Sequence, residues 1–432
     1  MAALGEDVRE AVRLLVDAAR LLARHWPAIV AWVVGGYVAH ELLVRFAAWI
    51  ALGRPRAKVL ADYVEYDTTP DVWARVAGFG LLGLAALATL VMIVGVLSSM
   101  RADLPLRPVE YLPTFGARAR RVQHTLALVV APFLGFYAGW GLLDADQAYY
   151  RFLGQDFTVD LTRVDVPGIA VRLFVVALLA FLAKVVTTGL TRRFGKPALG
   201  LVAAVCEAVY LFLGVFAIGH GLRLLATWAQ TRVVWRATLD GYDAVVAALP
   251  SPFGDLVPAM VSAYADVVGA VLGHLKDGVV QPLVWLAIAF IVYQHIEGSA
   301  EDEDADTLSG GSGAVVARLA TRGIREKYVA FATATRSALR AGVVPFLVFC
   351  VYYLAVAVAI GWGWTALARY GIGPHPDWFW AEIAPWQRLG ESVLTDVLRL
   401  PLLAAGYALV VRRVRSRTAS TEGSTPVPLP RP

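Results

Sequence analysis

The chain has 432 residues, of which 58% are hydrophobic and only 17% are charged, and its mean hydropathy is +0.61. Soluble domains are about 45–50% apolar and about 25% charged, so this composition excludes an ordinary water-soluble protein and requires surface that faces lipid. The net charge of +5 comes mostly from Arg residues beside apolar segments rather than on one basic face, which argues against nucleic-acid binding. We therefore expect an all-α, polytopic helical bundle in a cell membrane.

Residues 1–26 interleave charged and apolar side chains at helical spacing. Leu4, Val8, Val12 and Leu15 fall near one helical face, opposite the charges. This pattern predicts a cytoplasmic amphipathic helix that lies in the membrane interface. Because the segment has no unbroken apolar stretch, we expect no cleavable signal peptide.

Eight apolar stretches follow, each near the ~20 residues that cross a hydrocarbon core. Six of them fall within residues 27–296 and two within residues 341–411. They are residues 27–52, 76–97, 125–143, 168–190, 198–220, 279–296, 341–362 and 393–411. With both termini cytoplasmic, the inner segments carry 23 Lys and Arg residues and the outer loops 12, the bias that the positive-inside rule expects.

The segments between the spans differ in character. Residues 222–278 form a long outer segment with apolar residues at helical spacing, which predicts a helix lying on the outer face of the bundle. Residues 297–340 combine a basic amphipathic helix with an acidic linker, which favours a solvated spacer over a cation site because its carboxylates lack ligand spacing. Residues 412–432 predict a disordered, basic and Pro-rich cytoplasmic tail.

A short similarity between spans suggests an internal repeat. Residues 129–136 (VVAPFLGF) and residues 343–349 (VVPFLVF) agree at six positions with one gap. One interpretation is two four-helix halves related by an axis along the membrane normal, whereas chance matches are common in sequence rich in Ala, Leu and Val. Equivalent packing of the two halves would support the repeat.

The first span carries the densest set of polar side chains. Tyr37, His40, Glu41 and Arg45 fall on one helical face, and a charge within the membrane is costly unless it faces protein or water. One interpretation is a proton or ion pathway in which His40 and Glu41 titrate. The other is a structural Glu41–Arg45 pair at i,i+4, with His40 bound by a neighbour.

Two further spans carry charges. Lys184 and Glu207 lie at comparable depth in the fourth and fifth spans, which a short basic turn joins, so we expect an intramembrane ion pair between them. The alternative is that Lys184 reaches the inner interface alone. Asp396 and Arg399 near the outer end of the eighth span predict a local pair that extends toward the interface.

No nucleotide-binding loop, hydrolase motif or zinc-ligand spacing occurs, so the sequence assigns no catalytic residue and favours a non-enzymatic protein over an enzyme. We predict no metal and no cofactor. The expected partners are membrane lipid and either other proteins or further copies of the chain, without nucleic acid. Three functions stay open: a permease-like transport or export component, a non-catalytic scaffold or assembly subunit, and an enzyme on a lipid-linked substrate. A polar cavity at His40 and Glu41 would favour the first, a solid bundle with exposed apolar surface the second, and an acidic cleft near Asp62 the third.

Overall fold

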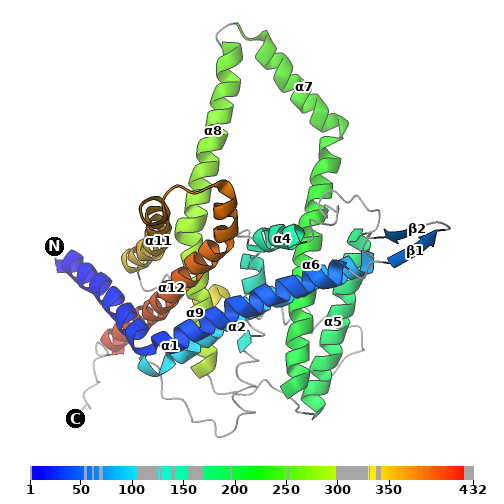
Figure 1. The fold of residues 1–432 in the computed structure, drawn as a ribbon. Helices are drawn as coiled ribbons and strands as arrows, with labels where there is room; N and C mark the ends of the chain where they lie inside the picture. Colours follow the sequence, from blue (N-terminus) through cyan, green and yellow to red (C-terminus); the bar gives the residue numbers. More distant parts are fainter. Residues whose placement is uncertain are drawn as a thin grey trace, which may run out of the picture.

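The first element is a single long helix, α1 (Ala2–Leu52), which joins the expected N-terminal amphipathic helix to the first span. Pro27 lies inside it, and Figure 1 shows a sharp bend between its N-terminal part and the rest. A proline in a helix interior removes one backbone hydrogen bond and crowds the preceding turn, so it bends the helix. The boundary expected at residue 26 is therefore a bend rather than a break between two helices.

The other elements are nearly all helical. They are β1 (Arg56–Leu60), β2 (Tyr63–Asp67), α2 (Val72–Ser99), η1 (Arg101–Asp103), α4 (Leu142–Leu153), α5 (Ile169–Phe194), α6 (Pro197–Gln230), α7 (Val233–Ala248), α8 (Phe253–Leu275), the π-helical turn η2 (Lys276–Val280), α9 (Gln281–Glu297), α11 (Val343–Ala366), the π-helical turn η3 (Leu367–Ile372) and α12 (Asp377–Glu422). The computed structural model describes residues 2–52, 56–60, 63–67, 72–104, 125–126, 129–137, 142–153, 169–194, 197–250, 253–297, 329, 331–336 and 342–422.

Within these residues, seven helical stretches are long and apolar enough to cross a membrane, as judged by length and composition. They coincide with every expected span except the third. The third span is described at residues 125–126 and 129–137, which are helical, and its remaining positions lie outside the described residues. The acidic linker at 298–313 also lies outside them. The protein is a multi-pass, all-α membrane bundle.

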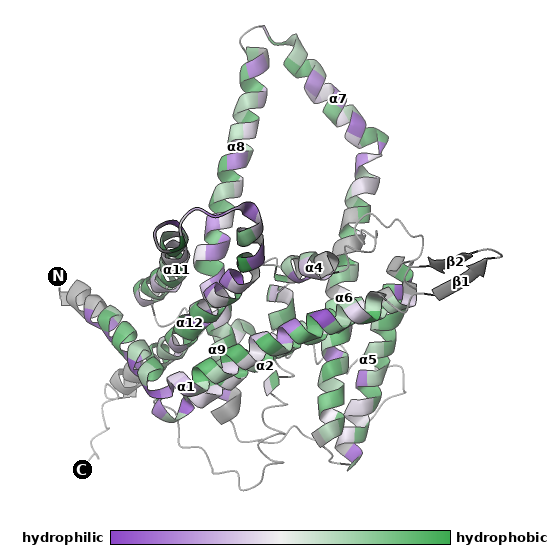
Figure 2. Ribbon diagram, in the orientation of Figure 1, coloured by the Kyte–Doolittle hydropathy of each residue, from purple (hydrophilic) through white to green (hydrophobic). Residues whose placement is uncertain are grey.

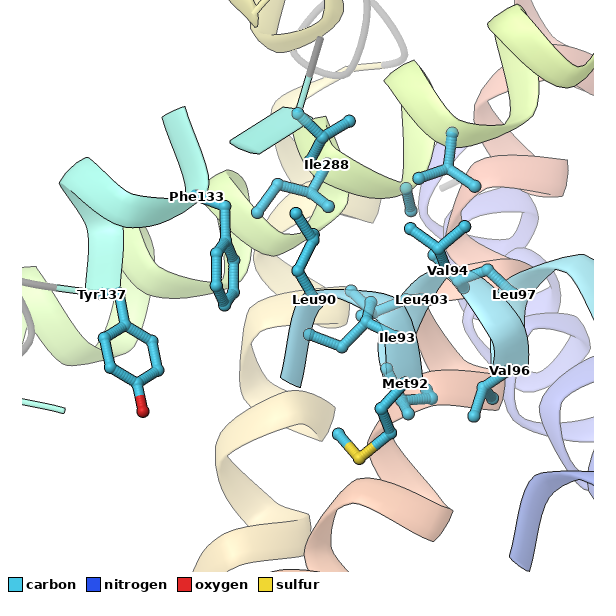
Figure 3. Close-up of a cluster of buried hydrophobic side chains, with 14 of the residues drawn as sticks. Leu90, Met92, Ile93, Val94, Val96, Leu97, Phe133, Tyr137, Ile288 and Leu403 are labelled. Atoms are coloured by element: carbon cyan, nitrogen blue, oxygen red, sulfur yellow. The ribbon is translucent and has the colours of Figure 1, made fainter. Parts of the chain in front are cut away.

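Helix α2 is the centre of the bundle. Its apolar stretch is 72% buried, whereas that of α5 is 6% buried. Leu90 and Ile93 of α2 meet Phe133, Ile288 of α9 and Leu403 of α12 in one apolar cluster (Figure 3). Helix α5 packs against α6 at the edge, and Figure 2 shows that both helices consist mainly of hydrophobic residues. The apolar residues of α5 and α6 are therefore available for contact with lipid or with a partner.

Helices α1 and α2 approach closely through small residues. A Cβ atom on Gly36 would lie 2.5 Å from the Cβ of Met92, and one on Gly95 would lie 2.5 Å from the Trp32 ring. Small residues let helix backbones approach in a membrane, where packing rather than the hydrophobic effect drives association. These two reciprocal contacts fix the register of α1 on α2.

Helices α7 and α8 project away from the bundle instead of lying on its outer face (Figure 1). Every residue of α7 is exposed or half-buried, and α8, η2 and α9 form one helical run in which the apolar stretch covers Asp255–Gln294. At 1.5 Å per residue, those 40 residues span about 60 Å, twice a hydrocarbon core of about 30 Å. The expected surface helix is therefore a projecting arm, which we define as residues 221–275.

The two ends of the chain meet at one end of the bundle. Arg412 Nη2 lies 2.6 Å from Asp17 Oδ2, and Arg413 forms an ion pair with Glu10. Helix α12 continues to Glu422, so the first half of the tail expected to be disordered from residue 412 is helical. Gly423 is the first helix-breaking residue after Gly406, which explains why the helix runs on.

The helix pairs of the two halves do not match. Helix α1 packs along α2, whereas α6, which would correspond to α1, makes its main contacts with α5 and α2 rather than with α9. These contacts give the proposed repeat no support.

A small antiparallel hairpin interrupts the helical pattern after α1. Strands β1 and β2 pair Arg56 with Asp67 and Leu60 with Tyr63. The order of the apolar spans predicts an outer loop between residues 52 and 76, and nothing in that pattern indicates a hairpin.

Candidate functional site

The polar face of α1 is in contact with other helices, as its composition requires. Tyr37, His40 and Glu41 are half-buried, and Arg45 is exposed. Each of the four side chains contacts a polar group on another element or on α1 itself. From position 37 to position 45 the helix rises about 12 Å, so these contacts occupy little more than two turns.

His40 lies at the centre of this face. Its Nε2 is 3.2 Å from Asp146 Oδ1 on α4 and 3.3 Å from the Tyr137 hydroxyl. The Tyr137 hydroxyl donates to Asp146 Oδ2 at 2.5 Å. We call these three residues the His40 cluster. It brings an imidazole, a phenol and a carboxylate from three elements into mutual contact.

The three side chains of the His40 cluster are largely shielded from solvent. The His40 and Asp146 side chains are 18% and 11% exposed, and Tyr137 is buried. With its proton on Nε2, His40 donates to the carboxylate, and a second proton on the ring turns that contact into an ion pair.

One turn before His40, Tyr37 connects α1 to α12. Its hydroxyl donates to Asp396 Oδ2 at 2.8 Å. Arg399 turns instead to α11, where Nε donates to the Tyr353 carbonyl at 3.2 Å and the guanidinium lies 4.0 Å from the Tyr353 ring centroid. The local Asp396–Arg399 pair expected from the sequence is therefore replaced by contacts with two other helices.

One turn after His40, Glu41 and Arg45 form the i,i+4 pair that the structural interpretation required. Arg45 Nε donates to Glu41 Oε1 at 2.7 Å. Tyr149 of α4 also donates to Glu41, and Arg45 Nη2 lies 3.4 Å from the Tyr149 hydroxyl. Burial, and then the neighbouring Glu41 carboxylate, raises the pKa of Tyr149, so the phenol keeps the proton that it donates.

A different face of α1 borders an apolar cavity of about 680 Å³ between α1, α2 and α6. Its lining includes Trp32, Gly35, Ala39, Leu87 and Val205, and none of the described residues that line it is charged. Neither His40 nor Glu41 lines it. The polar cavity at His40 and Glu41 that would have favoured transport most directly is therefore not observed among the described residues. Helix α1 instead borders an apolar cavity and, on another face, carries the His40 cluster.

Lys184 and Glu207 join α5 to α6. Lys184 Nζ lies 3.0 Å from Glu207 Oε1, the contact expected from the sequence, and 5.4 Å from the Tyr210 ring centroid. The Glu207 side chain is 4% exposed. Because this pair lies on the outermost helix pair and borders neither the cavity nor the His40 cluster, its geometry fits a structural role.

Sequence reasoning missed the partners of the α1 face. Tyr137, Asp146 and Tyr149 lie about a hundred residues away, and only their position near the expected outer end of the third span hinted at a meeting with the outer part of α1. Among the residues that the structure describes, no three His, Cys, Asp or Glu side chains come together as a metal site. The chemistry available to this face is proton exchange and hydrogen bonding.

Comparison with protein-family models, with curated proteins and with solved structures finds no match to this chain.

Proposed function

We propose that this membrane protein is a permease-like transport or export component that moves an apolar or amphiphilic small molecule in exchange for protons. The observation that carries the proposal is the position of α1, which borders the apolar cavity on one face and holds the His40 cluster on another. A single helix is thereby in contact with both a candidate substrate site and a candidate proton site.

The cavity supports the substrate class. Its volume of about 680 Å³ falls within the ~300–1,000 Å³ range of small-molecule sites, and its lining offers apolar contact without a charge. Trp32, on the lining, is 44% exposed, and Gly35 is exposed as well, so the cavity opens at the side of the bundle. A molecule dissolved in the lipid can enter from that side.

The His40 cluster supports the coupling. A proton on His40 strengthens its attraction to Asp146 of α4, because the contact becomes one between opposite charges in a poorly solvated place. That change biases the position of α1 relative to α4. Occupation of the cavity also biases α1, and two ligands that favour different positions of one element are thermodynamically coupled.

The substrate half of the proposal can be tested with a fluorescent apolar probe, 1-N-phenylnaphthylamine, added to the purified protein in detergent. A Cβ atom on Gly35 would meet nothing within 4 Å, so Gly35→Leu fills the cavity without disturbing its walls. Gly189 on α5 is equally open and lies outside the cavity lining, so Gly189→Leu is the matched control.

We expect the wild type and Gly189→Leu to bind the probe with the same affinity, and Gly35→Leu to bind it at least tenfold more weakly. Equal binding by Gly35→Leu and the wild type, or no saturable binding by the wild type, would show that the cavity is not the substrate site.

A second function, as a subunit that assembles with another protein, is supported by the projecting arm. Val233, Val234, Trp235, Tyr264 and Val271 are each more than 45% exposed, and the arm extends away from the bundle (Figure 1). A water-exposed apolar surface of this kind marks an interaction site, whereas a lipid-embedded one does not.

Site-specific spin labels distinguish these environments. Cysteines introduced at Val234 and Tyr264 on the background lacking Cys206 and Cys350 would carry the labels. If the labels on the lipid-reconstituted protein are accessible to a water-soluble relaxation agent, and become inaccessible when a protein from the cell lysate co-purifies, the result supports assembly. Access only to oxygen places the arm in lipid and rejects this second function.

The third hypothesis, an enzyme on a lipid-linked substrate, required an acidic cleft near Asp62. Asp62 and Asp71 lie outside the described residues, and β2 is described between them. No geometry favours this function, and we do not propose it.

A further inference from the structure

A second pocket, of about 260 Å³, lies where the two ends of the chain meet. The N-terminal part of α1, the turn η1 and the last part of the apolar stretch of α12 form its walls. It shares no lining residue with the cavity and includes no member of the His40 cluster, so it is a separate site from those of the proposed transport function.

Charged side chains form the rim of this pocket. Arg412 pairs with Asp17 at 2.6 Å, and Arg24 pairs with Asp103 at 2.8 Å. Arg20 also lines the pocket but makes no ion pair or hydrogen bond with the residues that the structure describes. Three guanidinium groups against two carboxylates leave an excess positive charge, and it resides on Arg20.

The two ion pairs also hold the rim in place. Asp103 accepts from Arg24 and contacts His25 Nε2 at 2.6 Å, which ties η1 to α1. Asp17 ties α1 to α12 through Arg412. A guanidinium presents a planar set of donors that suits phosphate oxygens, so a rim already held in place is prepared to bind a phosphate group.

The inner wall of the same pocket is apolar. Leu21, Leu104, Ala405 and Ala408 line it. Trp26, which is 58% exposed, follows two residues after Arg24, and Trp side chains are enriched at the boundary between lipid and water. The pocket therefore pairs a positive rim with an apolar wall at the level where lipid headgroups are expected.

We propose that this pocket binds the phosphate of an anionic phospholipid, with Arg20 as the main cationic contact and the apolar wall against the start of the acyl chains. Free inorganic phosphate offers the same anionic chemistry but has no part that would contact Leu21 or Ala408. The apolar wall and Trp26 are the reasons to assign the lipid.

Native mass spectrometry of the detergent-solubilised full chain tests this proposal with three probes: dioleoyl-phosphatidylglycerol, dioleoyl-phosphatidylcholine and inorganic phosphate. Arg20→Gln removes the free guanidinium, and Arg20→Lys keeps the positive charge. Arg236 on α7 is exposed and remote from the pocket, so Arg236→Gln is the matched control for loss of one charge.

We expect the wild type to bind phosphatidylglycerol in preference to both other probes. Arg20→Gln should bind it about fivefold more weakly, the effect of one basic residue near an anionic lipid surface. Arg20→Lys, which keeps the charge but not the planar donors, should lose less affinity than Arg20→Gln, and Arg236→Gln should bind as the wild type does. All variants should bind the naphthylamine probe normally, which keeps this site separate from the cavity.

Equal binding of phosphatidylglycerol and phosphatidylcholine by the wild type overturns the proposal. So does equal loss in Arg20→Gln and Arg236→Gln, because the effect would then reflect net charge alone. Displacement of the lipid by millimolar inorganic phosphate would instead assign the pocket to a soluble anion and overturn the lipid assignment.

Discussion

Lys184 Nζ lies 3.0 Å from Glu207 Oε1, and this contact joins α5 to α6 at the edge of the bundle. Helix α5 packs mainly against α6, so a charge pair between them affects how α5 is held. Removing the cation takes the Lys184 ammonium away from the buried Glu207 carboxylate, which costs about 3 kcal/mol.

The first prediction follows from this pair. Lys184→Ala should lower the free energy of unfolding by about 3 kcal/mol, measured by denaturant titration in detergent micelles. The double variant Lys184→Glu with Glu207→Lys should recover at least half of the stability that either reversal alone removes. If the double reversal is less stable than both single variants, the contact does not hold α5 to α6.

The second prediction concerns two neighbouring glycines of α1. Gly36→Ala places a Cβ atom 2.5 Å from the Cβ of Met92, so α1 must move away from α2, and overpacking of this kind costs about 1–3 kcal/mol. Gly35→Ala meets open space and should leave the free energy of unfolding unchanged or slightly higher. The same titration measures both variants, and equal stability of the two would contradict the close approach of the helices.

The third prediction concerns the hydrogen bond between Tyr37 and Asp396. Tyr37→Phe keeps the ring but removes the donor, which leaves a partly buried carboxylate oxygen without that bond and should cost about 1–3 kcal/mol. Tyr264 on α8 is 71% exposed, so Tyr264→Phe is a control that should change nothing. Thermal unfolding followed by tryptophan fluorescence compares them, and an unchanged midpoint for Tyr37→Phe would show that this bond contributes no stability.

Much of the fold follows from hydropathy because each span is a local pattern. The apolar stretches, the polar face of α1 at positions 37, 40, 41 and 45, and the closeness of Lys184 to Glu207 across a short turn all depend on neighbours in the sequence. The cost of a lone charge in lipid was enough to indicate that the polar groups of α1 face protein or water.

The missed features depend on contacts between distant segments. Nothing local to α1 indicates that His40 meets Asp146, since that contact joins helices 106 residues apart. The projecting arm was missed for a related reason, because the spacing of apolar residues predicts a helix but not whether that helix folds back onto the bundle. Pro27 was read as the start of a span, although a proline inside a long apolar helix can bend it and leave it continuous.

The central claim is that the His40 cluster exchanges protons in step with occupation of the cavity. Proteoliposomes loaded with the pH indicator pyranine and given a transmembrane pH gradient test it directly. The naphthylamine probe recrosses lipid unaided, so its exchange for protons by the protein would run as a cycle that dissipates the gradient.

We expect the probe to accelerate decay of the gradient severalfold with wild-type protein and with Gly189→Leu. His40→Gln keeps a hydrogen-bonding side chain but cannot be protonated, so it should bind the probe normally in detergent and yet show no acceleration. If the probe accelerates decay equally in wild-type and His40→Gln proteoliposomes, or in neither, His40 does not couple protons to the cavity and the central claim is wrong.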